Sequence, residues 1–186
     1  MKNKRTYLIE TARLGLRTWR VADQAPFAVI NANEQVMEYF PSRMSWQQTQ
    51  DYIDRIRQHF LQHGFGLYVV DELATGKMIG CVGFNKPTFK ADFMPCVEIA
   101  WRLHPQVWGQ GYATEAAQAC LDYGWQTLGL EEVTSFTAIA NKRSARIMQK
   151  IGMERKGEFD HPNLSSTHWL CPHVWYRIQS PTIGAK

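Results

Sequence analysis

The sequence predicts an α/β (α+β) fold with a mixed, mostly antiparallel central sheet of about seven strands and helices on both faces. Three observations support this prediction. Strand-like and helix-like patterns follow one another in the order β-α-α-β-β-β-α-β-α-β-β. Two neighbouring strands are joined by a Gly-containing turn, which is typical of an antiparallel hairpin. One strand–helix–strand unit predicts a parallel, right-handed crossover.

The N-terminal half is expected to supply one strand, two helices and the hairpin. Polar and apolar residues alternate in the first segment, as in a half-buried strand. Ser45 is a suitable N-cap for the second helix, whose apolar residues recur at helical spacing. The expected elements are strand 13–19, helices 22–31 and 46–63, and hairpin strands 67–71 and 77–84.

The C-terminal half is expected to contain the crossover and a closing pair of strands. The strand after the long helix is rich in β-branched residues, and Gly152 is a suitable C-cap for the short helix that follows. The expected elements are strand 96–103, helix 112–128, strand 132–140, helix 141–151, and strands 153–159 and 170–178.

Length and charge favour one globular domain that binds a small ligand. The 186 residues are expected to form a single domain, 1–186, with its core at about 12–178. Apolar residues make up 45% and charged residues 20% of the chain, an ordinary globular composition. The net charge of +4 mildly favours anionic ligands but is too small to indicate a nucleic-acid partner.

The chain shows no targeting or metal-binding pattern. No window approaches the roughly 18 apolar residues that cross a bilayer, and the basic residues 1–5 precede too short a stretch for a secretory signal. The four cysteines are far apart and lack metal-ligand spacing, so we expect reduced thiols and no metal. A cytoplasmic protein without membrane contact, monomeric or homodimeric, is predicted.

The most informative stretch is a predicted strand, a turn with two glycines and a helix start. Gly109 and Gly111 permit positive φ and a close approach of the backbone to a ligand. The first amides of the helix that starts at Tyr112 lack intrahelical acceptors and carry the positive end of the helix dipole. Together these features predict a site for a pyrophosphate.

Spacing decides which pyrophosphate ligand this is. Neither G-x-G-x-x-G nor G-x-x-x-x-G-K-[ST] is present, which disfavours dinucleotide and P-loop proteins. Instead, Gln106-x-x-Gly109-x-Gly111 resembles the [QR]-x-x-G-x-[GA] signature of GCN5-related N-acetyltransferases. Asn141-Lys142-Arg143-Ser144 and Ile151-Gly152-Met153 resemble that family's later N-x-x-S and L-G-[FM] elements. The resemblance runs from about Leu14 to Ile178 and is greatest to the branch of ribosomal-protein-alanine N-acetyltransferases.

This resemblance implies acetyl-CoA as cosubstrate and an amine acceptor, with direct attack of the amine in a ternary complex. The pantetheine arm would lie between the two crossover strands, along 100–104 and 137–140, and an amide near Arg102 or Leu103 would stabilise the oxyanion. Asn141 would bond the arm or its thioester. The implied cofactor-binding residues are Leu103, His104, Trp108, Gly109, Gln110, Gly111, Tyr112, Ala113, Asn141 and Ser144.

Three residues are candidates for catalysis. Glu98, inside the strand before the turn, is the preferred general base, acting through a water, although it also fits a structural ion pair. His161, in the loop before the last strand, is the rival base because imidazole titrates near neutrality. Met148 stands where many members of the family have a Tyr that protonates the thiolate, so Ser144, a water or no acid at all has that role.

A CoA-binding sensor or structural module without turnover is the alternative function. The glycine turn supports CoA binding in either case, and the missing Tyr keeps the alternative open. The amine acceptor is not encoded in any motif of the sequence.

Overall fold

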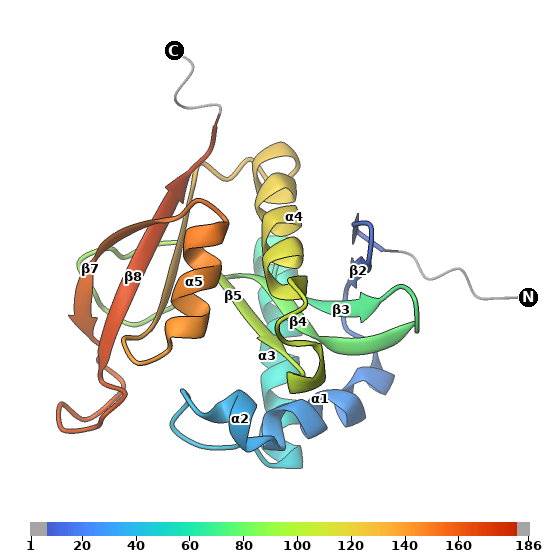
Figure 1. Cartoon of the computed structure of the whole chain (residues 1–186), viewed down its shortest axis with the longest axis horizontal. Coiled ribbons are helices and arrows are strands. Elements are labelled where there is room, and N and C mark those ends of the chain that lie inside the picture. Colours follow the sequence, from blue (N-terminus) through green and yellow to red (C-terminus); the bar gives the residue numbers. More distant parts are fainter. Residues whose placement is uncertain (1–6, 182–186) are drawn as a thin grey trace, which may run out of the picture.

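The computed structural model describes residues 7–181 and contains one eight-stranded sheet with the order β1-β2-β3-β4-β5-β6-β8-β7 (Figure 1). Only β5 and β6 pair in parallel; the other neighbours are antiparallel. The basic residues 1–5 lie outside the described residues. The strands are β1 (Ile9–Glu10), β2 (Leu14–Arg17), β3 (Leu67–Glu72), β4 (Lys77–Asn85), β5 (Glu98–Leu103), β6 (Glu132–Ala138), β7 (Glu154–Asp160) and β8 (Pro172–Gln179).

The predicted fold class is confirmed, and the structure adds one strand to the expected seven. Strand β1 has only two residues, which is too short to produce an alternating pattern in the sequence. The sequence analysis also missed α2, a single turn of helix. The helices are α1 (Gln24–Ala32), α2 (Glu34–Met37), α3 (Trp46–His63), α4 (Tyr112–Gln126) and α5 (Lys142–Lys150), with 3-10 turns η1 (Val21–Asp23) and η2 (Pro105–Val107).

Helix α3 has the predicted bounds because both of its ends carry strong local signals. The Ser45 side chain accepts a hydrogen bond from the Gln48 backbone, and the Gln48 side chain accepts one from the Ser45 backbone. At the other end, Gly64 adopts the left-handed conformation (φ 76°) that closes a helix.

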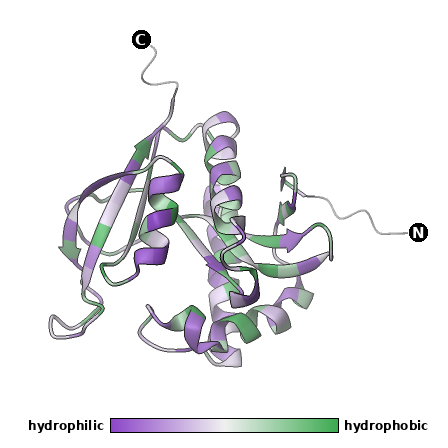
Figure 2. Cartoon of the chain, viewed as in Figure 1, coloured by the Kyte–Doolittle hydropathy of each residue, from purple (hydrophilic) through white to green (hydrophobic). Residues whose placement is uncertain are grey.

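Two hydrophobic cores lie on the two faces of the sheet. One buries α4 and α5 against the strands, with Met148 as the buried residue of α5. The other buries α1, α2 and α3. Figure 1 shows α4 and α3 on opposite sides of the sheet, and Figure 2 shows α5 as a mainly hydrophilic helix. Within 7–181, no helix combines the length and apolar character needed to cross a membrane.

A buried ion cluster fixes β2 against η1 and β3. The Arg17 guanidinium is 5% exposed and bonds both Asp23 and Asp71 at 2.7–3.0 Å. A buried charge is tolerated when it is paired and its hydrogen bonds are satisfied, as they are here. Arg17 therefore provides a reference for Arg102, the other buried arginine within residues 7–181.

Candidate functional site

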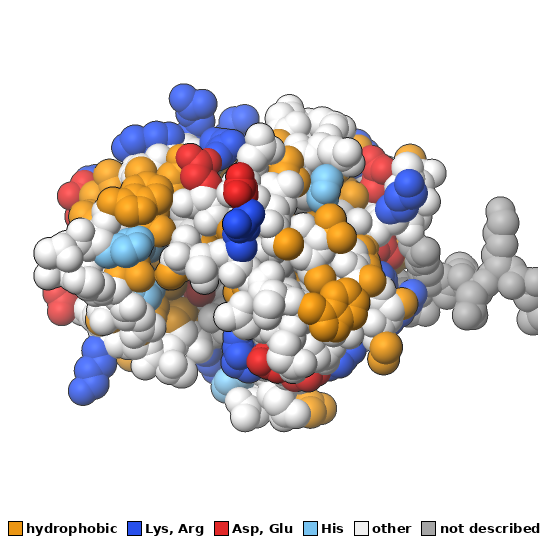
Figure 3. Space-filling view, turned by 90° about the horizontal axis from the view of Figure 1, so that it is seen from below, with side chains coloured by type: hydrophobic (Ala, Val, Ile, Leu, Met, Phe, Trp, Pro, Cys, Tyr) orange, Lys and Arg blue, Asp and Glu red, His pale blue; other side chains and the backbone are white. Residues whose placement is uncertain are grey.

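A cavity of about 720 Å³ opens between β5, β6, the start of α4, the start of α5 and the segment around α2. The face of the molecule seen from below is hollowed near its centre, and charged as well as uncharged side chains border the hollow (Figure 3). Both halves of the predicted site reach this cavity, since its lining includes Glu98, Gly111, Ser144 and His161.

The cavity exists because β5 and β6 separate. They form a single residue pair, Glu98 with Thr134, whereas β4 and β5 form six pairs. The Thr134 backbone N–H donates to Val97 O at 2.8 Å, and the Ser135 hydroxyl donates to Ile99 O at 2.9 Å. Beyond Ile99 no strand of the described chain pairs with this side of β5.

Backbone groups of β5 therefore face the gap. In an antiparallel pair, hydrogen-bonded and non-bonded residue pairs alternate. The His104 N–H donates to Ile79 O, so the backbone groups of Arg102, two residues earlier, also face β4. The backbone groups of Trp101 and Leu103 face the other way, into the gap. The sequence predicted an oxyanion donor near Arg102 or Leu103. Because the Arg102 amide faces β4, only the Leu103 amide of these two faces the gap.

The turn between β5 and α4 presents a row of backbone donors. Gly109 and Gly111 have φ of 76° and 83°, a conformation that strongly favours glycine. The backbone N–H groups from Gly109 to Ala113 donate no hydrogen bond to any other described residue. Trp108, also among the implied cofactor-binding residues, does not offer its backbone N–H to a ligand, because this group already donates to Pro105 O at 3.0 Å.

Side chains of other elements hold this turn in place. Arg13 donates to Gln110 O at 2.9 Å and bonds the Glu115 carboxylate at 2.7 Å. Its guanidinium also lies 4.4 Å from the centre of the Tyr112 ring. The His104 imidazole accepts from the Gln106 backbone at 3.3 Å and caps η2. The glycine turn is thus held by contacts from other parts of the protein.

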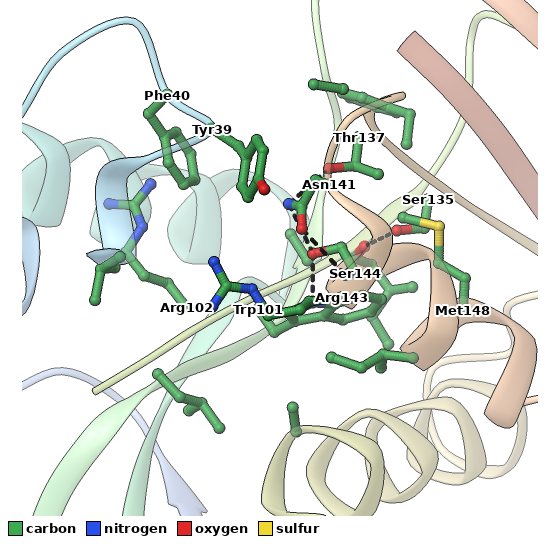
Figure 4. Close-up of a pocket in the computed structure, with 18 of the residues that line it drawn as sticks. Tyr39, Phe40, Trp101, Arg102, Ser135, Thr137, Asn141, Arg143, Ser144 and Met148 are labelled. Atoms are coloured by element: carbon green, nitrogen blue, oxygen red, sulfur yellow. Dashed lines mark hydrogen bonds between the residues drawn. The ribbon is translucent and has the colours of Figure 1, made fainter. Parts of the chain in front are cut away.

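Asn141 and Ser144 form a polar cluster at the start of α5, on the far side of the gap (Figure 4). Asn141 Oδ1 accepts from the Ser144 backbone, which caps the helix. Asn141 Nδ2 donates to Thr137 Oγ1 at 3.0 Å and to Ser144 Oγ at 3.1 Å. Both amide hydrogens of Asn141 are therefore engaged, and Oδ1 is its remaining acceptor for a ligand.

Glu98 lies where β5 and β6 begin to separate, half-buried in the cavity wall. Asn85, directly opposite on β4, donates to its carboxylate at 3.4 Å. Burial raises the pKa of Glu98 to about 7, and the hydrogen bond from Asn85 opposes this rise. A carboxylate with a pKa near neutrality is well suited to accept a proton at neutral pH.

His161 reaches the same cavity from the loop after β7. Its ring packs 4.8 Å from the Phe89 ring and 4.9 Å from the His173 ring, and burial lowers its pKa. Nδ1 accepts a hydrogen bond from the Asn163 backbone at 3.3 Å. Because an accepting nitrogen carries no hydrogen, the neutral ring holds its proton on Nε2, and its lone pair is occupied.

Met148 and two aromatic residues, Tyr39 and Phe40, complete the walls of the cavity. Met148 is 1% exposed and lines the cavity from α5. Tyr39 and Phe40 line it from the segment after α2, and the exposed Trp169 lies 6.1 Å from the Tyr39 ring. The described residues contain no group of three or more His, Cys, Asp or Glu side chains that could hold a metal ion.

The sequence analysis did not identify the side chain of Arg102 as part of the site. This residue is 8% exposed, lines the cavity and donates to Asn31 Oδ1 at 2.7 Å. A signal was available, because Arg102 is the only charged residue among the apolar neighbours Ile99 to Leu103. Its partner on α1, 71 positions away, leaves no local trace in the sequence.

Comparison with known proteins gives a consistent result. The acetyltransferase (GNAT) domain family matches residues 13–154. YkkB of Bacillus subtilis, an uncharacterised protein, is 30% identical over 179 residues, which cover 96% of this chain and 98% of YkkB. YnaD of the same organism, an uncharacterised N-acetyltransferase, is 29% identical over 151 residues, covering 81% of this chain and 85% of YnaD. A crystal structure of a GNAT-family acetyltransferase from Bacillus anthracis is 26% identical, with a TM-score of 0.77 over 92% of this chain and 97% of that one.

The fold, the separated strands and the glycine turn define an acyl-CoA-dependent acyltransferase. With a family match over most of its length, the chain belongs to the GNAT acetyltransferase family. The family resemblance of the Gln106–Gly111 motif is confirmed. The closer likeness to ribosomal-protein-alanine acetyltransferases stays a prediction.

Proposed function

We propose that the protein transfers the acetyl group of acetyl-CoA to a primary amine, of a small molecule or a protein N-terminus, by direct attack in a ternary complex. The observation that carries this proposal is the row of unpaired backbone donors from Gly109 to Ala113 beside the open gap between β5 and β6. The row suits a pyrophosphate, and the gap suits an extended amide-containing arm.

In this proposal the pantetheine arm lies against the free backbone groups of Trp101 and the free amide of Leu103, whose carbonyl accepts from Trp108 Nε1 at 2.9 Å. The oxyanion formed during attack accepts a hydrogen bond from an amide on this side of β5, the Leu103 amide being the donor nearest the turn. Oδ1 of Asn141 accepts a hydrogen bond from the arm directly or through water. The Leu103 amide has no other protein partner, and Asn141 Oδ1, which accepts from the Ser144 backbone, has room for a second hydrogen bond.

Glu98 acts as the general base, through a water. The amine nitrogen forms a bond to the thioester carbonyl carbon, its proton passes to the Glu98 carboxylate, and the carbon–sulfur bond breaks to release CoA. Glu98 is preferred to His161 because the lone pair of His161 already accepts the Asn163 backbone hydrogen bond. The CoA thiolate takes its proton from Ser144 or from water.

The alternative is a protein that binds CoA without turnover. Nothing in the turn distinguishes the two functions, but a half-buried carboxylate with a pKa near 7 favours catalysis. The test is a screen of amines with acetyl-CoA in which the free thiol of CoA is measured, alongside calorimetric titration of acetyl-CoA. Transfer to any amine supports the proposal, and tight acetyl-CoA binding with no thiol release above the uncatalysed rate supports the alternative.

A further inference from the structure

Arg102 has an environment that its burial does not explain. Its guanidinium forms no ion pair with any carboxylate of residues 7–181, whereas the equally buried Arg17 bonds both Asp23 and Asp71. The protein partners of Arg102 are the neutral Asn31 Oδ1 and the sulfur of Met44, both bonded to Nη1. Burying a charge without an opposite charge costs free energy of folding, so such a residue is a candidate for binding an anionic ligand.

The edge of the guanidinium formed by Nε and Nη2 has no hydrogen-bond partner in the described protein. Nε is buried and has no hydrogen-bond partner, and Nη2 makes no hydrogen bond to any described residue. These two N–H groups form the edge that carboxylates engage through two parallel hydrogen bonds. The unsatisfied edge of Arg102 therefore matches a carboxylate in shape as well as in charge.

Aromatic rings surround this guanidinium on its other sides. The central carbon of Arg102 lies 4.4 Å from the centre of the Phe40 ring, 5.1 Å from that of Tyr52 and 5.9 Å from that of Phe27. Figure 4 shows Arg102 beside Phe40 at the edge of the cavity. The rings hold the planar group in place and keep water away, which strengthens a hydrogen bond to an anion.

The position of Arg102 separates it from the proposed pyrophosphate site. Side chains alternate along β5, so Ile99 and Leu103 pack in the core of α4, and Ala100 packs in the core of α1 to α3. Arg102 contacts Asn31 of α1 and lies on this second face, together with Glu98. The small Ala100 between them leaves room along the strand.

We propose that Arg102 binds a carboxylate of the acceptor, so that the preferred substrate is an amine that also carries a carboxylate, such as an amino acid. This inference rests on the proposed acetyl transfer, and it deepens that function by naming the class of acceptor. The amine lies toward Glu98 and the carboxylate toward Arg102, on one face of β5.

The test compares acids with their neutral counterparts. Glycine, β-alanine, longer ω-amino acids and common α-amino acids are each paired with the corresponding carboxamide, and kcat/KM is measured for both. The wild-type protein is expected to prefer at least one acid by about 10- to 100-fold, the range expected of a hydrogen bond to a charged group. The Arg102→Met variant is expected to reduce this ratio to about one by slowing reaction of the acid only.

A second variant keeps Arg102 and gives its guanidinium a carboxylate partner within the protein. Asn31→Asp is nearly isosteric and places a carboxylate 2.7 Å from Nη1, while Thr49 Oγ1 can donate to the new oxygen. This variant is expected to melt at a higher temperature than the wild type and to lose the preference for acids, although Arg102 is intact. Arg143→Met is the matched control, because Arg143 lines the same cavity but pairs with Glu38; it is expected to keep the acid-to-amide ratio.

Two results overturn the inference. One is a ratio near one for every pair in the wild type, and the other is a preference for acids that survives in both Arg102→Met and Asn31→Asp. If acetyl-CoA binds but no amine is acetylated, the proposed function fails, and calorimetric titration of the same acids and their N-acetyl derivatives into the CoA complex decides the inference. Saturable binding that Arg102→Met abolishes supports a carboxylate site, and no binding to the wild type overturns it.

Discussion

Trp101 and Ser144 are joined across the gap beside β5: the indole Nε1 of Trp101 donates a hydrogen bond of 3.3 Å to Ser144 Oγ. The same oxygen accepts from Asn141 Nδ2 at 3.1 Å. With both acceptor sites of the hydroxyl occupied, its own hydrogen is directed elsewhere and is available to a ligand in the cavity. Ser144 is therefore held as a hydrogen-bond donor, even though it is a weak acid.

Ser144→Ala is expected to lower kcat by less than about tenfold, below the 10²–10⁴-fold contribution of a general acid, because a thiolate leaves without full protonation. Thr137→Val is the control, since it removes the other bond made by Asn141 Nδ2 and keeps the Ser144 hydroxyl. Steady-state kinetics at saturating acetyl-CoA measure both. A loss above about 100-fold for Ser144→Ala alone would assign the proton donor to Ser144.

Gly111→Val is expected to weaken acetyl-CoA binding by about tenfold or more, measured by calorimetry. A side chain at φ 83° is strained by about 1–2 kcal/mol, and its Cβ would lie 3.5 Å from Nη2 of Arg13, the residue that holds the turn. Gly129→Val is the matched control, because Gly129 has φ 65°, open space around it and no part in the cavity. It is expected to cost similar stability and leave acetyl-CoA affinity unchanged. Affinity within twofold of the wild type in a folded Gly111→Val protein would mean that the pyrophosphate lies elsewhere.

Met148→Leu is expected to change kcat by less than about threefold, because the two side chains have similar volumes and neither exchanges a proton. Met153→Leu, in the same core but outside the cavity lining, controls for repacking. The measurement is kcat of the wild type and of both variants with one efficiently acetylated amine. A 100-fold loss confined to Met148→Leu would show that the sulfur of Met148 takes part in the reaction.

Glu98 is expected to make the protein less stable as the pH rises. Its folded pKa of about 7 lies above the ordinary value of 4.5, so the folded state binds a proton that the unfolded state has released between these values. The stabilisation that this bound proton contributes is fully present below about pH 4.5 and is lost as the pH rises through 7. Urea unfolding should therefore show Glu98→Gln gaining stability relative to the wild type between about pH 5 and pH 8. A constant difference between the two proteins over this range would mean that burial does not raise this pKa.

The parts of the fold that the sequence predicted well are those with local causes. Helix α3 could be placed residue by residue, because Ser45 and Gly64 mark its ends. The glycine turn could be recognised because Gly109 and Gly111 satisfy a backbone requirement that few other residues meet. In contrast, β1 consists of two residues and is defined by its pairing with β2, which no local pattern reveals.

The site was predictable where it depends on backbone and strand order, and not where it depends on contacts between distant segments. The position of Glu98 at the separation of β5 and β6 follows from the crossover. The bond from Arg102 to Asn31 joins β5 to α1, and the bond from Asn163 to His161 depends on the local shape of a loop. Neither contact produces a periodic pattern in the sequence, so the sequence drew attention to the His161 imidazole and not to the Arg102 guanidinium.

The pH dependence of kcat/KM tests most directly whether the carboxylate of Glu98 accepts the amine proton. For an acceptor whose own pKa is above about 9, the neutral amine alone gives a slope of one in log kcat/KM against pH. The wild-type protein is expected to show a slope of two below about pH 7, where Glu98 also must lose its proton, and a slope of one above it. Glu98→Gln is expected to show a slope of one throughout and a rate about 10²–10⁴-fold lower above pH 7, while His161→Gln keeps the wild-type profile. An unchanged profile and full turnover in Glu98→Gln, with both lost in His161→Gln, would show that Glu98 is not the base and would assign this role to the loop after β7.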